Sequence, residues 1–491
     1  MAGDKIRFLR RGRVVMYGSA NPTRTVLDYL RLEEKSRGTK EGCNEGDCGA
    51  CTVALGTLRN GRVVYEPVNA CIMLMGQLHG KELVTVDDLA DDGTLHPTQQ
   101  SMVERHGSQC GFCTPGFVMA LFTLYHSGKK PTRQDIVDHI AGNLCRCTGY
   151  RPIVDAARDA CTGRAIDRWA KAEKETVRQL QALNDGSDIF VGSNERFLAV
   201  PAKAETLAQL AAEHPDATIV AGSTDVGLWI TKQLRDLPKI IHTGGVAELH
   251  VITDTGDKLS LGAAATYSEA ERHLSAIDPD VAEVLRRLGA KQVRASGTVG
   301  GNVANGSPIG DTPPMLIALG ATLHLRHGND LRKLAIEDFF IAYGKQDRAP
   351  GELVWRLDIP KLKRNEAFRA YKISKRFDQD ISAVLAAFKL TLEGPRVASA
   401  RLAYGGMAAT PKRAKRAEAA IAGASLDAPA TWDAAMRALE QDFEPITDMR
   451  ASAAYRMETA QALLRKALIE IAGKPTRTTR VVGMRELAHA G

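Results

Sequence analysis

The chain has 491 residues, of which 44% are hydrophobic and 25% charged, and its formal net charge is +7. These values are ordinary for a water-soluble protein of about three to four domains, and no apolar run reaches the roughly 18 residues of a membrane span. Basic residues are interleaved with acidic ones, which argues against nucleic-acid binding, and the N-terminus lacks the apolar core of a signal peptide. We therefore expect a cytoplasmic globular protein.

Residues 1 to about 87 are predicted to form a small β-rich unit. Thr25 is the expected N-cap of a helical stretch over 26–32. Asn60-Gly61 is a strong hairpin signal. Short apolar runs on either side of turns predict four strands, at 6–9, 14–17, 52–58 and 62–68.

Residues 88 to about 165 are predicted to be helical. Pro115 suits the first turn of a helix that follows it. Thr132 and Asp135 resemble a capping box, and a further helix is expected over 153–161.

Three further stretches differ in pattern. Residues 166–188 are polar and read as a partly helical linker, whereas strand-like and helical runs alternate over 189–378. From 379 to 491 strands come first, then helices, and a basic tail begins at Lys474.

The nine cysteines are the first specific feature, because eight of them precede residue 150. Disulfide frameworks belong to small secreted domains, whereas clustered thiols in a reducing compartment predict metal binding. The ninth, Cys161, stands apart, and we expect it to be a buried structural thiol.

The first cysteine group has the spacing C-x4-C-x2-C at Cys43, Cys48 and Cys51, and Cys71 follows after a hairpin. This is the spacing of plant-type [2Fe–2S] ferredoxins. Glycines in the loop let backbone amides turn toward the sulfurs and stabilise the added electron. A structural zinc site is the alternative, but such sites usually pair two short cysteine hairpins.

The second cysteine group consists of Cys110 and Cys113, which precede one predicted helix, and Cys145 and Cys147, which follow another. Two helix ends would each offer two thiolates to one metal centre, and helix dipoles would stabilise the anionic site. The spacing predicts a second metal centre but does not by itself fix its type.

These motifs resemble those of the xanthine dehydrogenase and molybdenum hydroxylase family. Gly42–Cys51 (GCNEGDCGAC) is similar to its first [2Fe–2S] motif, and Gln109–Gly116 (QCGFCTPG) with Asn143–Ile153 (NLCRCTGYRPI) to its second. The resemblance implies two [2Fe–2S] clusters, with that of the helical domain next to the molybdenum cofactor and the ferredoxin-like one nearer the flavin. Gln109 and Cys147 match positions that approach the pterin.

Two glycine-rich stretches stand out in the second half of the chain. Ile219–Val226 reads as a strand, a tight turn and a helix start whose amides could cradle a pyrophosphate. Ser296–Asn302, continued by Ser307–Asp311, is unusually rich in small residues. No Gly-x-Gly-x-x-Gly follows a strand, so a Rossmann fold is not indicated. Either stretch alone could be an ordinary turn.

Together, in this order, the two stretches resemble the FAD domain of the same family, which is of the vanillyl-alcohol-oxidase type. Asp311, Val354 and Lys372 match further flavin-contacting positions, and Leu288 matches a flavin-packing one. The run Lys372–Asp380 matches the loop where nicotinamide docks, although a solvated charged loop is the alternative. The positions implied to bind FAD phosphates and ribose are Ile219, Val220, Ala221, Gly222, Ser223, Thr224, Asp225, Val226, Thr298, Val299, Gly300, Gly301 and Asn302.

The resemblance covers about residues 5–475 and implies a multidomain α+β architecture. The expected parts are a β-grasp, plant-ferredoxin-like [2Fe–2S] domain (1–87), a helical [2Fe–2S] domain (88–165), a linker (166–188), an FAD-binding domain (189–378) and an α+β flavoprotein C-terminal domain with a basic tail (379–491).

The resemblance also implies an electron-transfer subunit. No stretch matches a molybdopterin domain, so the substrate site and its catalytic residues are expected on a molybdopterin-binding large subunit, in an α2β2 heterotetramer. Electrons from hypoxanthine or xanthine oxidation would pass through both clusters to FAD and then NAD, because a flavin converts single electrons into a hydride. The fused domain order is that of two-subunit enzymes acting on xanthine.

Three alternatives remain at this stage. The chain could be the same subunit for an aldehyde or an N-heterocycle. It could be a stand-alone NADH-oxidising flavin and iron–sulfur reductase. It could also be a zinc-bound scaffold without redox function.

Overall fold

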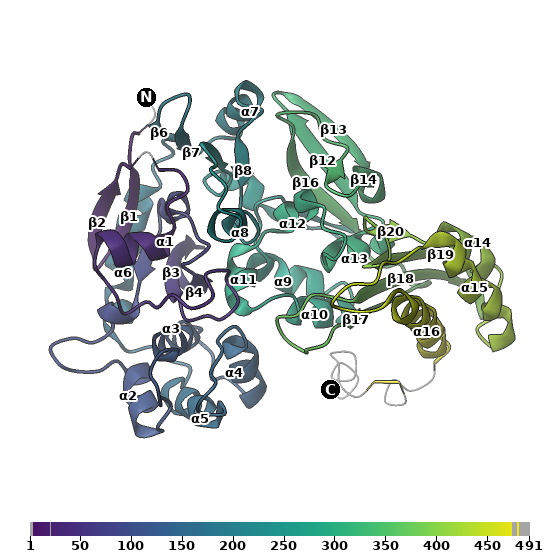
Figure 1. The fold of residues 1–491 in the computed structure, drawn as a ribbon, viewed down its shortest axis with the longest axis horizontal. Helices are drawn as coiled ribbons and strands as arrows, with labels where there is room; N and C mark the ends of the chain where they lie inside the picture. Colours follow the sequence, from purple (N-terminus) through teal and green to yellow (C-terminus); the bar gives the residue numbers. More distant parts are fainter. Residues whose placement is uncertain (1–2, 20, 474–478, 481–491) are drawn as a thin grey trace. The chain divides into compact units, whose positions relative to one another are not determined.

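The computed structural model describes residues 3–19, 21–473 and 479–480, and its contacts divide the chain into two compact units (Figure 1). The first comprises residues 1–247 and 289–297, the second 248–288 and 298–491. Each unit has its own sheets and hydrophobic cores. Within the described ranges no helix is long and apolar enough to cross a membrane. The predicted tail lies outside them, except for Thr479 and Arg480.

A five-stranded sheet opens the first unit. Its strands are β1 (Ile6–Arg10), β2 (Arg13–Tyr17), β3 (Thr52–Arg59), β4 (Arg62–Asn69) and β5 (Glu82–Val84), in the order β2-β1-β5-β3-β4. Asn60 and Gly61, both with positive φ, form the predicted hairpin turn. Thr25 caps the predicted helix, which begins as α1 (Val26–Asp28) and continues as a π-helical turn, η1 (Tyr29–Glu33). Short 3₁₀ turns, η2 (Met75–Leu78) and η3 (Val86–Asp88), flank β5.

Four helices follow this sheet, namely α2 (Pro97–Glu104), α3 (Thr114–Tyr125), α4 (Arg133–Ile140) and α5 (Arg151–Ala160). Helix α3 is almost wholly apolar and is buried from Gly116 to Tyr125, so it forms the centre of this domain's core. Thr132 and Asp135 make the predicted capping box of α4. The predicted linker contains α6 (Arg168–Leu183), whose C-terminal leucines pack on Leu9 of the first sheet.

The first unit also contains a four-stranded sheet, with β6 (Ile189–Gly192), β7 (Phe197–Val200), β9 (Lys239–His242) and β8 (Thr218–Val220) in that order. Strands β7, β9 and β8 are parallel. Helices α7 (Ala204–Glu213), α8 (Val226–Thr231) and α11 (Lys291–Ser296) accompany it. The turn from β8 to α8 is the strand–turn–helix predicted at 219–226, at the carboxyl end of a parallel strand, where ligands of such sheets bind.

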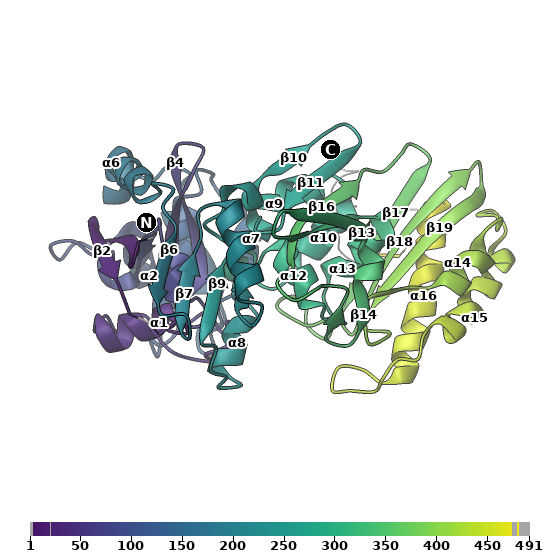
Figure 2. The same ribbon diagram turned by 90° about the horizontal axis from the view of Figure 1, so that it is seen from above.

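The second unit has two larger sheets (Figure 2). The first contains β10 (Ile252–Asp254), β11 (Lys258–Gly262), β16 (Leu353–Pro360), β12 (Thr322–His327) and β13 (Asp330–Ala335), all antiparallel, with the small hairpin β14 (Phe340–Ala342) and β15 (Lys345–Gln346) beside it in sequence. Its helices are α9 (Tyr267–Ser275), α10 (Pro279–Arg286), α12 (Val299–Asn305) and α13 (Thr312–Leu319).

The second sheet of this unit carries the C-terminal part of the chain. It contains β17 (Glu366–Ile373), β18 (Val384–Glu393), β19 (Arg396–Gly405) and β20 (Lys412–Arg413), followed by α14 (Lys415–Ile421), α15 (Asp433–Asp442) and α16 (Ala453–Ile471). The helices pack on the sheet around the buried Trp432. Strands followed by helices is the order that the sequence predicts, and the whole chain is a multidomain α+β protein.

Candidate iron–sulfur and flavin sites

The first cysteine group lies in the ferredoxin-like domain, with its sulfurs in two pairs, one of partly buried and one of buried cysteines. Cys43 and Cys48 share the loop before β3, and the amide of Cys43 donates to the Cys48 sulfur at 3.3 Å. Cys51 directly precedes β3 and Cys71 follows β4, with 3.2 Å between their sulfurs. Two pairs of thiols suit a two-iron cluster, in which each iron takes two cysteine sulfurs.

Backbone amides in this loop turn toward sulfur. The amides of Asp47 and Cys48 donate to Cys43 Sγ at 3.4 and 3.3 Å. Gly46 and Gly49 have φ of +78° and +68°, which only glycine adopts at low cost. The pKa of the Cys43 thiol is lowered to about 5 by the hydrogen bond from Cys48, and these amides add to the effect. The loop therefore favours thiolate, the form that ligates iron, at Cys43, whereas the hydrogen bond with Cys43 raises the pKa of the Cys48 thiol.

The second cysteine group lies at the surface of the helical domain. Cys113 is the N-cap residue of α3 and contacts the Cys145 thiol, while Cys147 contacts Cys110. Burial acts to raise the pKa of Cys145, but hydrogen bonds from the Thr148 hydroxyl and amide keep it below its ordinary value. Cys110 and Cys147 are exposed, unlike Cys51 and Cys71. Cys110 and Cys113 precede α3, and Cys145 and Cys147 lie in the loop between α4 and α5, so the four thiols come from two loops beside helices.

The loops of the two cysteine groups touch through their backbones. The amide of Leu144 donates to the carbonyl of Cys48 at 3.0 Å. A Cβ on Gly49 would lie 2.2 Å from the carbonyl oxygen of Gly142, so no side chain fits there. Cys161, by contrast, is buried away from both groups with its thiol toward the Leu121 carbonyl, and burial raises its pKa to about 12.

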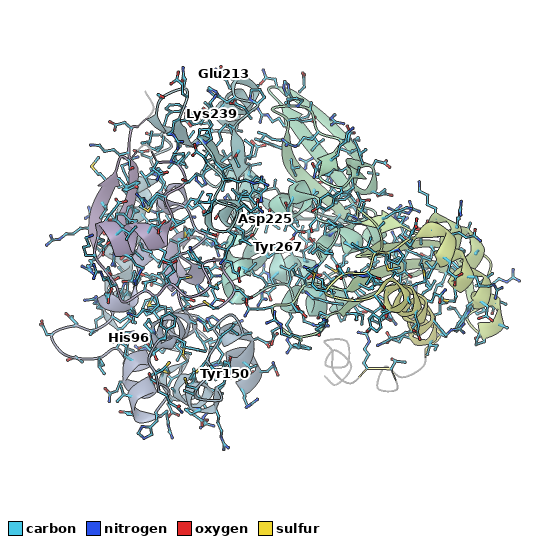
Figure 3. The ribbon with its side chains drawn as sticks, in the orientation of Figure 1. His96, Tyr150, Glu213, Asp225, Lys239 and Tyr267 are labelled. Carbon is cyan, nitrogen blue, oxygen red and sulfur yellow. The ribbon has the colours of Figure 1, made fainter. Side chains whose placement is uncertain are left out.

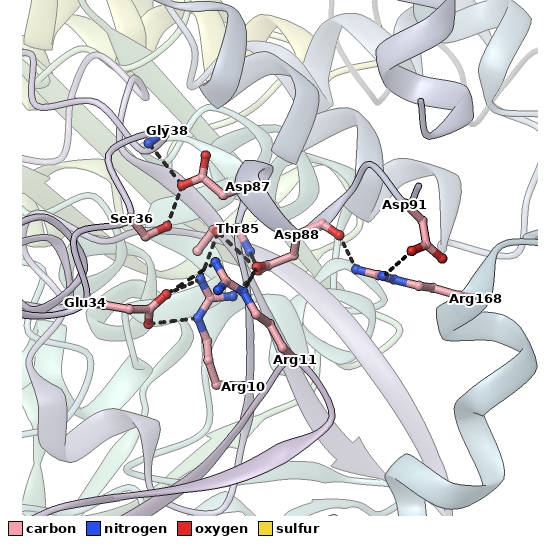
Figure 4. A network of polar contacts seen from close by, with 10 residues as sticks. All are labelled: Arg10, Arg11, Glu34, Ser36, Gly38, Thr85, Asp87, Asp88, Asp91 and Arg168. Carbon is pink, nitrogen blue, oxygen red and sulfur yellow. Dashed lines mark hydrogen bonds and ion pairs between the residues drawn. The ribbon is translucent and has the colours of Figure 1, made fainter. Parts of the chain in front are cut away.

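A charged network supports the chain that leads to the first cysteine loop (Figure 4). The nearly buried Arg10 forms ion pairs with Asp88 and with Glu34, at 2.7 Å from the latter. Asp88 also accepts from the amide of Thr85 at 2.7 Å, and Arg168 of α6 donates to the Asp88 carbonyl. The network joins β1, η1, η3 and α6, and no sequence motif predicts it.

The first glycine-rich stretch predicted to bind flavin, 219–226, belongs to the first unit. A Cβ on Gly222 would lie 2.0 Å from the Ser296 carbonyl oxygen, so this glycine is required by contact between two loops of the protein itself. Ser223 has φ of +55°, and its hydroxyl lies 2.7 Å from both the Ile72 carbonyl and Gln77 Oε1. Burial raises the pKa of Asp225 (Figure 3), which accepts from the indole of Trp229.

The remaining predicted flavin positions belong to the second unit. Thr298 caps α12 by accepting from the amide of Gly301 at 3.0 Å, and a Cβ on Gly300 would lie 2.4 Å from that of Ala263. Asn302 accepts from the hydroxyl of Thr312 at 2.7 Å. Small residues here let α12 begin directly against the segment between β11 and α9.

Asp311 and Lys372 form a buried ion pair in this unit. Lys372 Nζ lies 2.5 Å from Asp311 Oδ2 and 3.0 Å from the Arg287 carbonyl, and Ser382 donates to the other Asp311 oxygen at 2.5 Å. Leu288 is buried in the adjoining core, with Val354 packed against it. Ser382 and Arg287 were not identified as site residues from the sequence. The sequence signal that could have indicated them is that they lie close in the chain to the predicted positions Asp380 and Leu288, respectively.

Arg287 fixes the start of the predicted nicotinamide loop. Its guanidinium donates to the carbonyls of Lys372 and Phe377 at 2.9 and 3.2 Å and to the Ser374 hydroxyl at 3.0 Å. It also lies over the Phe377 ring. The run from 372 to 380 is therefore held at several points, unlike a freely solvated charged loop.

One further cluster, His96, His126 and Asp167, has the residue types of a metal site. Both histidine Nε2 atoms lie 2.8 Å from Asp167 Oδ2. The amide of Thr98 donates to His96 Nδ1 at 3.2 Å, which places the ring proton on Nε2, where it donates to Asp167. His96 caps α2, His126 ends α3 and Asp167 caps α6, so we interpret the cluster as a hydrogen-bonded junction of three helix ends.

Three family descriptions match successive parts of the chain. "[2Fe-2S] binding domain" matches residues 85–158, "FAD binding domain in molybdopterin dehydrogenase" matches 194–362, and "CO dehydrogenase flavoprotein C-terminal domain" matches 369–471. The chain therefore belongs to the iron–sulfur and FAD-domain proteins of the molybdenum hydroxylase family.

Among curated proteins the chain is similar to xanthine dehydrogenases. It is 32% identical to that of Emericella nidulans over 90% of this chain and 36% of the relative, and 32% identical to xanthine dehydrogenase/oxidase of Rattus norvegicus over 83% and 34%. The chain thus spans about a third of the length of these relatives.

Solved structures give a second comparison. CO dehydrogenase from Oligotropha carboxidovorans matches with a TM-score of 0.53 and 26% identity, over 58% of this chain and 99% of that chain. Quinoline 2-oxidoreductase from Pseudomonas putida 86 matches with a TM-score of 0.51 and 26% identity, over 56% and 95%.

Proposed function

We propose that this chain is the electron-transfer subunit of a xanthine dehydrogenase. It would accept electrons from a molybdopterin-binding partner subunit that oxidises hypoxanthine or xanthine, and would deliver them to NAD. The observation that carries the proposal is the pair of cysteine quartets, whose loops touch, in a chain whose relatives over most of its length are xanthine dehydrogenases.

In this proposal each quartet holds one [2Fe–2S] cluster: Cys43, Cys48, Cys51 and Cys71 the first, and Cys110, Cys113, Cys145 and Cys147 the second. When bound, the clusters carry single electrons and FAD converts them into a hydride for NAD. The amides at Cys43 Sγ would stabilise the added negative charge in the first site. The exposed sulfurs of Cys110 and Cys147 face the surface, where a partner's electrons would enter.

The flavin residues would bind and orient the cofactor. The amides at the turn from β8 to α8 would contact its phosphates, and those at the start of α12 would contact phosphate and ribose. Asp311 holds the Lys372 ammonium in place, and Thr312, which follows Asp311, donates to Asn302, another predicted flavin position. The loop from 372 to 380, held by Arg287, would receive the nicotinamide.

A test of the subunit assignment compares the isolated chain with the complex of the chain and its co-purifying partner. The isolated chain should oxidise NADH with an artificial electron acceptor, because that half-reaction needs only FAD and an outlet. It should not oxidise xanthine, and NAD reduction by xanthine should require the partner. Xanthine turnover by the pure chain would contradict the subunit assignment, and no NADH oxidation with FAD bound would contradict the nicotinamide loop.

A second candidate is the same subunit for another substrate. The similarity of this chain to CO dehydrogenase and quinoline 2-oxidoreductase supports this second candidate, because the matched parts of these proteins share its fold. If the assembled complex reduces NAD with an N-heterocycle or an aldehyde but not with xanthine, the electron-transfer role stands and the substrate changes.

A further inference from the structure

A glutamine from the flavin half of the chain is buried between the two cysteine loops. Gln292 of α11 donates from Nε2 to Asn143 Oδ1 at 2.8 Å and to Thr52 Oγ1 at 3.2 Å. Thr52 directly follows Cys51, and Asn143 lies two residues before Cys145. One side chain from a third domain therefore joins the loops of both predicted clusters.

The partners of Gln292 are also bonded to each other. Asn143 Nδ2 donates to the Gly49 carbonyl at 2.9 Å and to Thr52 Oγ1 at 3.1 Å, and the Thr52 hydroxyl donates to Gly49 at 2.7 Å. Gln292, Asn143 and Thr52 are only 1–2% exposed. If a donor is removed at such a buried position, its acceptor loses its hydrogen-bond partner and water cannot replace it. Breaking the arrangement therefore costs free energy.

The backbone around this group has no room for side chains at Gly142 and Gly116. A Cβ on Gly142 would lie 2.0 Å from Gln292 Oε1, and a Cβ on Gly116 would lie 2.1 Å from the Gly49 carbonyl oxygen. The two cysteine loops thus meet through close backbone contacts. Gln292 is the side chain that bonds to both loops from outside them.

We propose that Gln292 is a positioning residue that fixes the spacing between the two iron–sulfur clusters. Electron tunnelling falls steeply with distance, so the separation of two clusters sets how fast they exchange an electron. Gln292 acts through Asn143 on the Cys145 loop and through Thr52 on the Cys51 loop. The inference rests on the proposed function, since it needs both clusters to be present.

The test replaces Gln292 with methionine, which has a similar length and no donor. The complex of this chain with its partner is reduced fully, and the magnetic splitting between the two clusters is measured by low-temperature EPR. We expect full iron content, a smaller and broader splitting, and slower electron exchange between the clusters after rapid mixing with NADH. Gln209→Ala, on the exposed face of α7, is the matched control and should leave both measurements unchanged.

The outcomes separate this inference from the function on which it rests. A folded Gln292→Met variant with unchanged splitting and unchanged exchange would overturn the positioning role. If that variant does not accumulate as folded protein, Gln292→Ala is measured in the same way. Its splitting and exchange rate then decide whether Gln292 has the positioning role. A parent protein with only one cluster signal would instead overturn the proposed function.

Discussion

At the scale of single residues, Gly222 is required by a close contact within the protein itself. Its Cα faces the Ser296 carbonyl so closely that a Cβ would lie 2.0 Å from that oxygen. Gly222→Ala should push the two loops apart and lower FAD content, while iron content stays unchanged. FAD released on denaturation, per chain, measures this. Gly244→Ala, where a Cβ meets nothing within 4 Å, is the control, and equal FAD in both variants would remove the loop assignment.

Asp167 offers a pH-dependent test at the same scale. Burial acts to raise its pKa, but hydrogen bonds from His126 and His96 outweigh burial and hold the pKa below its ordinary value. A carboxylate with a lowered folded-state pKa stabilises the fold above its unfolded pKa of about 3.9, and this contribution is lost as the pH falls toward the folded value. Asp167→Asn should therefore unfold at a lower temperature than the parent at pH 7.

The difference in unfolding temperature between Asp167→Asn and the parent should shrink below about pH 4. Asp159→Asn, at a half-exposed surface ion pair of α5, should change little at either pH. A deficit of Asp167→Asn that is the same at pH 7 and in acid would show that the charge of Asp167 contributes nothing to the junction of α2, α3 and α6.

At the scale of elements, the network around Arg10 and Asp88 joins four segments far apart in sequence (Figure 4). Asp88→Ala removes the acceptor for Arg10, Arg11 and Thr85 at a nearly buried position. Breaking one side of a buried pair typically costs about 3–5 kcal/mol, reduced here because Glu34 remains beside Arg10. The ferredoxin-like domain should then open first and lose its cluster.

The measurement for Asp88→Ala is the EPR signal of each cluster, with total iron and FAD. We expect the signal of the Cys43 group to weaken while that of the Cys110 group and the FAD content persist. Asp91→Ala removes an exposed carboxylate 3.7 Å from Arg168 and serves as the control. Loss of both signals in equal measure would mean that the two iron–sulfur domains unfold together.

At the scale of the whole molecule, the order of the centres can be tested by breaking the chain of electron carriers at one end. Cys110→Ser should lower flavin reduction by substrate in the assembled complex, because electrons from the partner would enter at the exposed second group. Reduction of the flavin by NADH should survive. Cluster content must be measured alongside, since a serine oxygen can ligate iron weakly. Equal loss of both reactions in a folded complex would contradict the proposed order.

The sequence alone predicted the features that depend on neighbouring residues. The cysteine spacings, the hairpin at Asn60-Gly61 and the capping box at Thr132 follow from local geometry, and the structure shows each of them. The β8–α8 turn was predicted for the same reason, because a strand, a tight turn and a helix start are encoded within a few residues.

Tertiary structure alone decided the contacts between residues that are far apart in the chain. Gln292 lies 149 residues from Asn143 and 240 from Thr52, and Asp311 lies 71 from Ser382. No periodicity or motif predicts such pairs. A buried polar side chain needs a hydrogen-bond partner, and only the tertiary fold determines which distant residue lies close enough to be that partner. The sequence therefore specified which chemical groups each site contains, whereas the packing of the domains determined how those groups are held.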